Sequence, residues 1–166
     1  MSSTISSLSD VDWANWQPRD PATLVYIRVD DHVLLIRKKR GLGAGKINAP
    51  GGRLDPGETV LDCAIREVQE ELVIKPTGLD CIGENLFQFV DGYSLHAHVF
   101  LADGFEGIPQ ETDEAVPLWY HVENLPYDEM WEDDRLWVPL LFERRRFRAR
   151  YIFDDDRMLD HAIELL

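Results

Sequence analysis

The sequence lacks the features that mark secreted and membrane proteins. Two cysteines, Cys63 and Cys81, are too few for a disulfide framework. No apolar run comes near the ~18 residues of a membrane span. The first 20 residues carry no positive charge before Arg19 and no apolar block, so they do not indicate a secretory signal. These absences favour a protein of the reducing cytoplasm, and no membrane partner is expected.

Basic residues are also scarce. The chain has 17 lysines and arginines against 31 aspartates and glutamates, and its formal net charge is −14. Nucleic-acid polymers select clustered positive charge, so no such partner is expected. A small phosphorylated ligand is compatible with this charge when a metal cation lies between carboxylates and phosphates. A negative net charge can also do no more than keep a protein soluble. Whether this protein binds metal and phosphate must therefore be judged from the arrangement of particular acidic residues.

The chain shows no internal repeat and no low-complexity tract, and its 166 residues suit one domain. We expect residues 1–20 to form a loosely ordered arm, with Trp13 and Trp16 as candidate anchors. Residues 21–166 are then expected to form a single domain.

Hydrophobic patterns predict the order of strands and helices. Apolar and β-branched runs predict strands, paired as hairpins where they adjoin, at residues 22–29, 32–39, 84–90, 94–102, 116–123 and 147–153. Helical spacing predicts helices at 58–72 and 133–146, and the chain is expected to end in a short helix. Strands around two or three helices without regular βαβ alternation indicate an α/β (α+β) fold, an α/β/α sandwich with a mixed sheet.

The helix predicted at 58–72 carries three glutamates on one face. At roughly 100° per residue, Glu70 and Glu71 fall about 60° and 40° to either side of Glu67. The core face is expected on a separate arc, formed by Leu61, Ala64, Ile65, Val68 and Leu72. Repulsion between the carboxylates indicates a compensating cation, and Mg²⁺ shared with substrate phosphates fits best. A merely solvated acidic face explains the helix alone about equally well.

The surroundings of this helix favour the metal. From Gly52 the chain reads GRLDPGETVLDCAIREVQEELVI, which resembles the Nudix box, G-x5-E-x7-R-E-U-x-E-E-x-G-U with U aliphatic. The matching positions are Gly52, Glu58, Arg66, Glu67, Val68, Glu70, Glu71 and Ile74. Val73 departs from the pattern, because the family usually has glycine there to end the helix in a left-handed turn.

The resemblance implies a loop–helix–loop that holds Mg²⁺, with Mn²⁺ as a substitute, and hydrolyses a nucleoside diphosphate linked to another group. The metal ligands that it implies are Glu67, Glu70, Glu71, the backbone carbonyl of Gly51 and, further out, Glu114. One of the box glutamates also activates water, and we favour Glu71 as this base. Neighbouring carboxylates and a bound metal bring such a base and its water near neutral pH.

Three other residues of this segment are expected to have structural roles. Glu58 and Arg66 are expected to form a structural ion pair that fixes the loop beginning at Gly52 against the helix. Cys63, one turn before Glu67, is expected only to pack.

Segments outside the box resemble the oxidised purine nucleoside triphosphate hydrolases of the Nudix family. They are KKRGLGAGKINAPGG, HVFLADGFEGIPQETDEAVPLWY and DEMWEDDRLWVPLLFERRRF, and the similarity spans roughly residues 22–163. It implies a pyrophosphohydrolase that converts 8-oxo-dGTP or 2-oxo-dATP to monophosphate and pyrophosphate, and so cleans the nucleotide pool. The base pocket that it implies is lined by Thr23, Lys38, Asn48, Phe87, Trp131, Asp133 and Asp134.

The chemistry of these residues is compatible with a purine. Trp131 offers a flat face for stacking, worth about 1–3 kcal/mol, and Asn48 can both donate and accept hydrogen bonds. Asp133 and Asp134 can read a purine edge if one is protonated, as adjacent sheltered carboxylates allow. Taken alone, the aspartates suit a helix N-cap, the tryptophan suits packing and the asparagine suits a turn. Leu42 stands where such enzymes often have an aromatic residue.

Other functions are also compatible with the sequence. A Nudix enzyme can act on dinucleoside polyphosphates, nucleotide sugars or capped RNA ends, and a non-catalytic Nudix-fold module binds a nucleotide or a protein. Such a module would be expected to lose box glutamates, and none is missing here. His96 and His98 share a strand face, but no cysteine or further histidine completes a zinc set, so they are interpreted as surface or packing residues. The oligomeric state is not predicted.

Overall fold

The computed structural model describes residues 4–166. Its strands are β1 (Asp20–Val29), β2 (His32–Lys38), β3 (Ile47–Asn48), β4 (Gly51–Arg53), β5 (Lys75–Thr77), β6 (Asp80–Phe89), β7 (Ser94–Ala102), β8 (Gly104–Glu106), β9 (Ala115–His121), β10 (Phe147–Asp154) and β11 (Arg157–Leu165). Its α-helices are α1 (Val60–Leu72) and α2 (Asp134–Phe142), and its 3₁₀ helices are η1 (Leu8–Asp10) and η2 (Tyr127–Glu129). None of the helices in this part of the chain is long and apolar enough to cross a membrane.

A mixed sheet forms the centre of the molecule. Within the described residues it has nine strands, and its main path runs β11–β10–β6–β7–β1–β2–β3, with β4 paired to β1 and β9 to β2. The pairs β1–β7 and β6–β10 are parallel, and the other pairs of this sheet are antiparallel. Strands β5 and β8 form a separate small sheet.

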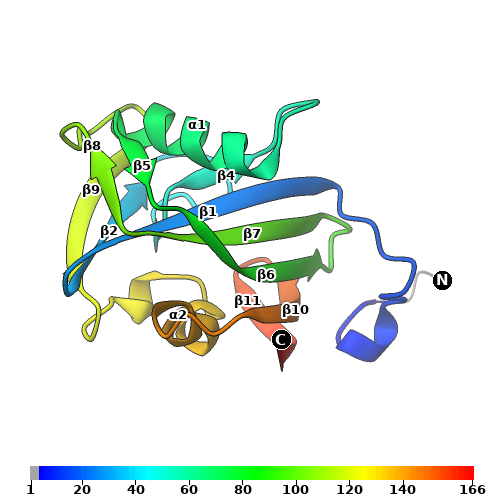
Figure 1. Cartoon of the computed structure of the whole chain (residues 1–166). Coiled ribbons are helices and arrows are strands. Elements are labelled where there is room, and N and C mark those ends of the chain that lie inside the picture. The colour runs from blue at the N-terminus through cyan, green and yellow to red at the C-terminus, as the bar shows by residue number, and fades with distance from the viewer. Residues whose placement is uncertain (1–3) are drawn as a thin grey trace.

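The two α-helices cover opposite faces of the sheet (Figure 1). One core cluster contains the buried α1 residues Ala64, Val68 and Leu72. The other contains the α2 residues Trp137, Val138 and Leu141. Alternating side chains of the central strands feed the two clusters, as expected for a sheet buried on both sides. The predicted sandwich with a mixed sheet is confirmed.

The prediction of a C-terminal helix is wrong. Residues 157–165 form strand β11, which pairs antiparallel with β10 from Phe147↔Leu165 to Asp154↔Arg157. The reversal uses Asp155 in a left-handed conformation, with a φ of 54°. The apolar residues of this segment have helical spacing, but the open edge of β10 offers backbone hydrogen bonds that override this weak local preference.

The predicted helix bounds and core face also need correction. Helix α1 begins at Val60, after the Thr59 cap, and α2 ends at Phe142 rather than at residue 146. Leu61 is 47% exposed instead of buried. It lies in the first turn of α1 and outside the core cluster that Ala64 and Val68 join one turn later.

The N-terminal arm has more structure than the sequence predicts. It contains η1 and lies against the sheet, although residues 1–3 of the arm fall outside the described residues. Trp16 Nε1 donates to Gln88 Oε1 at 2.9 Å, and the Arg150 guanidinium lies 5.5 Å from the Trp13 ring centre. Both tryptophans therefore contact the rest of the protein. The division into an arm and one domain stays a prediction.

Val73 ends α1 in the left-handed conformation that the box glycine normally supplies. Its φ and ψ are 61° and 35°, and its N–H donates to the carbonyl of Gln69 at 2.9 Å. A β-branched residue is strained there, because its Cβ approaches the following carbonyl. The exit geometry of the box is thus kept despite the substitution.

Replacing Val73 with glycine should therefore stabilise the protein. We expect the free energy of unfolding to rise by about 0.5–1 kcal/mol, because relief of strain outweighs the added freedom of the unfolded chain. Urea unfolding measures this change. Lys75→Gly, in strand β5 just beyond, should instead destabilise, and a loss of stability in Val73→Gly would refute the strain.

Candidate active site

Helix α1 positions the box glutamates. Its cap is Thr59, whose Oγ1 accepts a hydrogen bond from the N–H of Asp62 at 3.1 Å. From this start, Glu67 is partly buried, Glu70 is exposed and Glu71 is buried. The three predicted ligands thus differ in their access to solvent.

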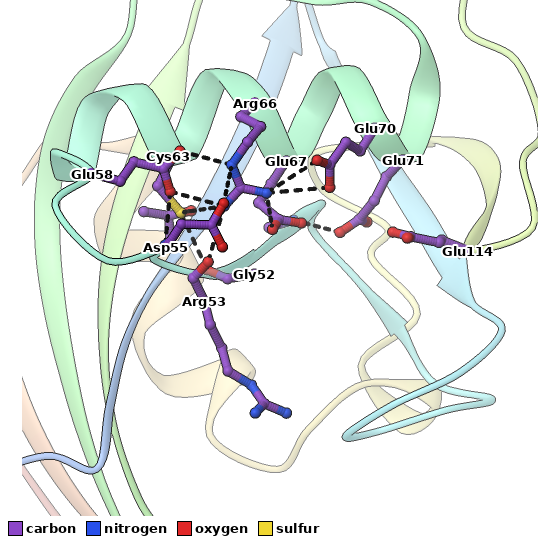
Figure 2. A network of polar contacts seen from close by, with 12 residues as sticks. Gly52, Arg53, Asp55, Glu58, Cys63, Arg66, Glu67, Glu70, Glu71 and Glu114 are labelled. Atoms are coloured by element: carbon purple, nitrogen blue, oxygen red, sulfur yellow. Dashed lines mark hydrogen bonds and ion pairs between the residues drawn. The ribbon is translucent and has the colours of Figure 1, made fainter.

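Arg66 joins the box loop to the helix (Figure 2). Its Nε and Nη2 donate to the two carboxylate oxygens of Glu58 at 2.7 and 2.9 Å, so the predicted ion pair is present. Its Nη2 also donates to the carbonyl of Arg53 at 3.1 Å. Contact with Arg66 lowers the pKa of Glu58 to about 2. The two parallel hydrogen bonds hold the loop in one orientation and keep the Glu58 carboxylate ionised.

The same guanidinium supports the acidic stripe. Nη1 of Arg66 donates to Glu67 Oε1 at 2.8 Å and lies 3.2 Å from both carboxylate oxygens of Glu70. Part of the positive charge that the clustered glutamates require therefore comes from within the helix.

Glu67, Glu70 and Glu114 form a carboxylate cluster. One oxygen from each lies within 4.8 Å of the others. Glu114 comes from the loop before β9, which is held to α1 because Thr112 Oγ1 donates to the carbonyl of Glu71 at 2.8 Å and accepts from the N–H of Glu114 at 3.2 Å. Three converging carboxylate oxygens suit a hard divalent cation, which leaves its other positions to water and phosphate.

Glu71 lies beside this cluster and is enclosed by the protein. Its Oε1 accepts a hydrogen bond from the N–H of Gly51 at 3.3 Å, and its Oε2 is buried without a hydrogen-bond partner among the described residues. Burial raises the pKa of Glu71 to about 8, and the charges of Glu67 and Glu114 act in the same direction. Without a metal this carboxyl is therefore mostly protonated near neutral pH, and a neighbouring cation would favour the ionised form that can accept a proton.

Glu71 should also make stability depend on pH when divalent metal is removed. Its pKa is about 8 in the folded protein against an ordinary 4.5, so the folded state binds this proton more tightly than the unfolded state. The contribution is complete below pH 4.5 and is lost as the pH rises through 8, and its size is at most a few kcal/mol. Urea unfolding across this range with a chelator measures it.

A matched pair of variants isolates the effect. Glu71→Gln should lose this part of the pH dependence, whereas Glu70→Gln, at an exposed position on the same helix, should keep it. Identical pH profiles for wild type and Glu71→Gln would contradict the buried, protonated state.

Two glycines let strand β4 approach its neighbours. A Cβ on Gly51 would collide with the backbone of Thr23 on β1, to which β4 pairs. A Cβ on Gly52 would lie 2.5 Å from the Glu67 carboxylate. The box glycine therefore makes room for the carboxylate of Glu67 beside the loop.

A cavity of about 190 Å³ extends from the box toward α2. All seven residues of the predicted base pocket line it: Thr23, Lys38, Asn48, Phe87, Trp131, Asp133 and Asp134. Gly51, Gly52 and Glu71 line it as well, whereas Glu67, Glu70 and Glu114 lie outside its wall. The roles of these residues stay predictions. The predicted base pocket and the box residues Gly51, Gly52 and Glu71 nevertheless line the same cavity.

Asp133 and Asp134 form a buried acidic pair in the wall of the cavity. Asp133 occupies the N-cap position of α2, yet it makes no capping hydrogen bond, and its Oδ2 accepts from Trp137 Nε1 at 2.7 Å instead. Burial raises the pKa of Asp133 to about 6, and burial together with the adjacent charge of Asp133 raises the pKa of Asp134 well above its ordinary value. Asp133 Oδ1 and Asp134 Oδ2 are buried without protein partners among the described residues. This arrangement fits a ligand better than a helix cap.

The other cavity residues combine flat apolar surface with polar groups. Trp131 is partly buried, with Phe153 packed edge-on at 5.6 Å between ring centres. Phe87 stacks on Tyr151 at 4.9 Å. Asn48 Oδ1 accepts from the N–H of Ala49 at 2.8 Å, so its amide is held locally as in a turn. Rigid aromatic walls of this kind suit a planar base.

Several residues of the cavity wall are absent from the sequence predictions. They are Ala22, Leu24, Ile36, Gly41, Ala49, Arg53, Phe89, Tyr93, Leu95, Ala97 and Trp137. Those on β1 and β7 alternate along the strand and share the α2 face of the sheet. The alternation is visible in the sequence. It predicts a shared cavity wall only when β1 and β7 are known to pair in parallel, because that pairing brings the two sets of side chains together.

Comparison with known proteins identifies the family. The family profile described as NUDIX domain matches residues 18–141. An oxidized purine nucleoside triphosphate hydrolase of Danio rerio is 40% identical over 86% of this chain and 92% of its own length. One of Mus musculus is 38% identical over 85% and 92%. An NAD-capped RNA hydrolase NudC of Pseudomonas syringae pv. tomato is 32% identical over 64% of this chain but 37% of its own length.

The fold agrees with this assignment. The mutator MutT protein of Bacillus halodurans matches with a TM-score of 0.77 over 87% of this chain and 97% of that protein, at 23% identity. The family profile and the sequence relatives agree with the box motif and with the sandwich fold. The chain therefore belongs to the Nudix family of hydrolases.

Proposed function

We propose that this protein is a divalent-metal-dependent pyrophosphohydrolase of oxidised purine nucleoside triphosphates such as 8-oxo-dGTP and 2-oxo-dATP. The observation that carries the proposal is one cavity whose wall includes both Glu71 and Gly51 of the box and the buried pair Asp133–Asp134. The relatives that match over nearly their whole length are named for the same activity. In a cell this reaction removes damaged precursors from the nucleotide pool.

The acidic pair is the proposed reader of the base. Oxidation of a purine changes which edge atoms donate and which accept hydrogen bonds. Raised pKa values let Asp133 and Asp134 share a proton, so one carboxyl donates while the other accepts. Buried polar groups discriminate strongly, because a ligand without the matching atom leaves them unpaired. Trp131 and Phe87 offer aromatic surface to the base.

The carboxylate cluster is the proposed metal site. Glu67, Glu70 and Glu114 offer converging oxygens, and we assign Glu71 and the Gly51 carbonyl as the further predicted ligands. When bound, Mg²⁺ neutralises phosphate charge and lowers the pKa of water. Mn²⁺ has the same preference for oxygen ligands and is the proposed substitute.

The protein then has two tasks in the reaction. It holds the triphosphate so that water can attack at phosphorus, and it accepts one proton from that water, a role that we assign to Glu71. Water cleaves the bridge between the α- and β-phosphates: one P–O bond of the bridge breaks, a P–O bond to the water oxygen forms, and monophosphate and pyrophosphate are released. Arg66 takes no part in the proton transfer and keeps Glu58 and the box loop in place.

Another Nudix substrate is the second candidate. The NudC relative supports it, but that match spans 37% of the relative and leaves most of its length without a counterpart here. A non-catalytic binding module is disfavoured because the box glutamates and their Arg66 support are complete. We propose a cytoplasmic location and a nucleotide as the main partner, in accord with the free cysteines Cys63 and Cys81.

A pyrophosphate-release screen tests the proposal. Normal and oxidised purine and pyrimidine triphosphates are compared with a dinucleoside polyphosphate, a nucleotide sugar and capped RNA, each with Mg²⁺ and with Mn²⁺. An oxidised purine nucleotide should exceed the pyrimidine triphosphates in kcat/KM by about 10-fold or more. Preference for one of the other phosphate compounds would replace the proposed substrate, and no turnover at all would support a binding module.

A further inference from the structure

Three potential metal ligands outside the glutamate cluster meet on strands β6 and β7. His96 and His98 lie on β7, and Glu84 lies opposite His98 on β6. Their side chains share the α1 side of the sheet, because Phe100 and Ala102, at the same alternation of β7, pack in the α1 cluster. The third ligand missing from the sequence pattern is thus a carboxylate on the adjacent strand.

The spacing of the donor atoms fits one small ion. His96 Nε2 and His98 Nδ1 lie 3.4 and 3.7 Å from Glu84 Oε1. The three donor atoms all fall within 4.8 Å of one another. A tetrahedral zinc ion with bonds of about 2.0–2.1 Å requires donor separations of about 3.3–3.4 Å. The observed distances approach these values and are long for direct hydrogen bonds.

The facing nitrogens of His96 and His98 have the Glu84 carboxylate as their polar neighbour among the described residues. His96 Nε2 is buried and makes no hydrogen bond among the described residues. Burial lowers the pKa of both His96 and His98, so the neutral rings keep the lone pairs that a metal requires. The two rings stack with centres 4.3 Å apart and planes at 22°, so both are held in one orientation. A buried nitrogen without a partner is costly unless something binds it.

We propose that Glu84, His96 and His98 form a second metal site that binds Zn²⁺ independently of the nucleotide. Two imidazoles and one carboxylate form a known zinc ligand set, which water completes to four. Side-chain exposures of 33%, 20% and 19% for Glu84, His96 and His98 leave an opening for that water. The bound ion cross-links β6 to β7.

Two neighbouring features define the setting of this site. In the strand register His98 lies beside Thr23 on β1, and Thr23 lies beside Gly52 on β4, so the site is separated from the Nudix box by one strand. Arg148 on β10 has its Nε 3.9 Å from Glu84 Oε2. This cation competes with the ion for Glu84 and should weaken its binding.

Metal binding to untagged protein tests the site. After chelator treatment, Zn²⁺ is titrated by calorimetry into the Glu67→Gln/Glu70→Gln variant, in which two of the three carboxylates of the glutamate cluster are neutralised. One equivalent should still bind, and Co²⁺ in its place should give the intense visible absorption of a tetrahedral complex. His96→Gln and His98→Gln in this background should weaken binding by at least ~100-fold and abolish the Co²⁺ band, since even outer partners contribute 10–100-fold.

Matched variants separate a true site from general loss of structure. His121→Gln removes one ring of the edge-to-face pair His32–His121, whose ring centres are 5.3 Å apart, and should leave Zn²⁺ binding unchanged. Arg148→Gln should tighten binding about 2- to 5-fold, because it removes the competing exposed charge. Unaltered binding in His96→Gln, equal loss in His121→Gln, or weaker binding in Arg148→Gln would each overturn the site.

Discussion

Replacing Glu67 or Glu71 with glutamine should lower kcat by at least ~10²-fold while the fold is kept. Glutamine preserves shape and removes the negative charge. At position 71 the amide oxygen can still accept the hydrogen bond from Gly51, so the loop stays in place while the proton acceptor is lost. At position 67 one oxygen of the carboxylate cluster loses its charge.

Steady-state rates of pyrophosphate release with saturating Mg²⁺ measure this effect. Glu106→Gln, at an exposed position on β8, is the matched control and should retain wild-type turnover. Circular dichroism and thermal unfolding confirm that each variant is folded. Near-normal turnover in both Glu67→Gln and Glu71→Gln would remove the glutamate helix from the chemistry.

Replacing Asp133 or Asp134 with asparagine should change the ranking of oxidised against normal purines. Asparagine fixes one donor and one acceptor at a position where a carboxyl adapts by gaining or losing a proton. We expect the ratio of kcat/KM between oxidised and normal purine triphosphates to shift by about 10-fold or more in at least one of the two variants. The asparagine at 133 keeps an acceptor for Trp137, so the cavity wall is retained.

The readout for this prediction is a ratio, which a general loss of stability does not change. Asp128→Asn, on the exposed side of η2, is the control and should leave the ranking unchanged. An equal loss on every nucleotide in both variants would mean that the pair supports the fold instead of reading the base.

The features that the sequence predicts well are local ones. Helix α1 follows from a cap, an apolar seam and a box within one continuous segment, and the Glu58–Arg66 pair needs only that helix and its loop. The strands with strong alternation also form as predicted. Such patterns depend on neighbours in sequence, which a single chain displays directly.

The features that it misses depend on contacts between distant segments. Strand β11 is a strand because β10 lies beside it, and its own spacing favours a helix. Glu84 lies opposite His98 only because of the β6–β7 register. In the sequence the two histidines therefore appear without a third ligand. The base pocket could be assigned from family resemblance, whereas the residues alone favoured a cap for Asp133 and packing for Trp131.

The most direct test of the active site is the position of the metal with nucleotide bound. Crystals of Glu71→Gln with 8-oxo-dGTP and Mn²⁺ are measured at the manganese absorption edge. We predict an anomalous peak between the carboxylates of Glu67 and Glu70 and the phosphate chain, with the base next to Asp133 and Asp134. A nucleotide bound in this cavity with no manganese beside those glutamates would contradict metal-assisted hydrolysis by this helix.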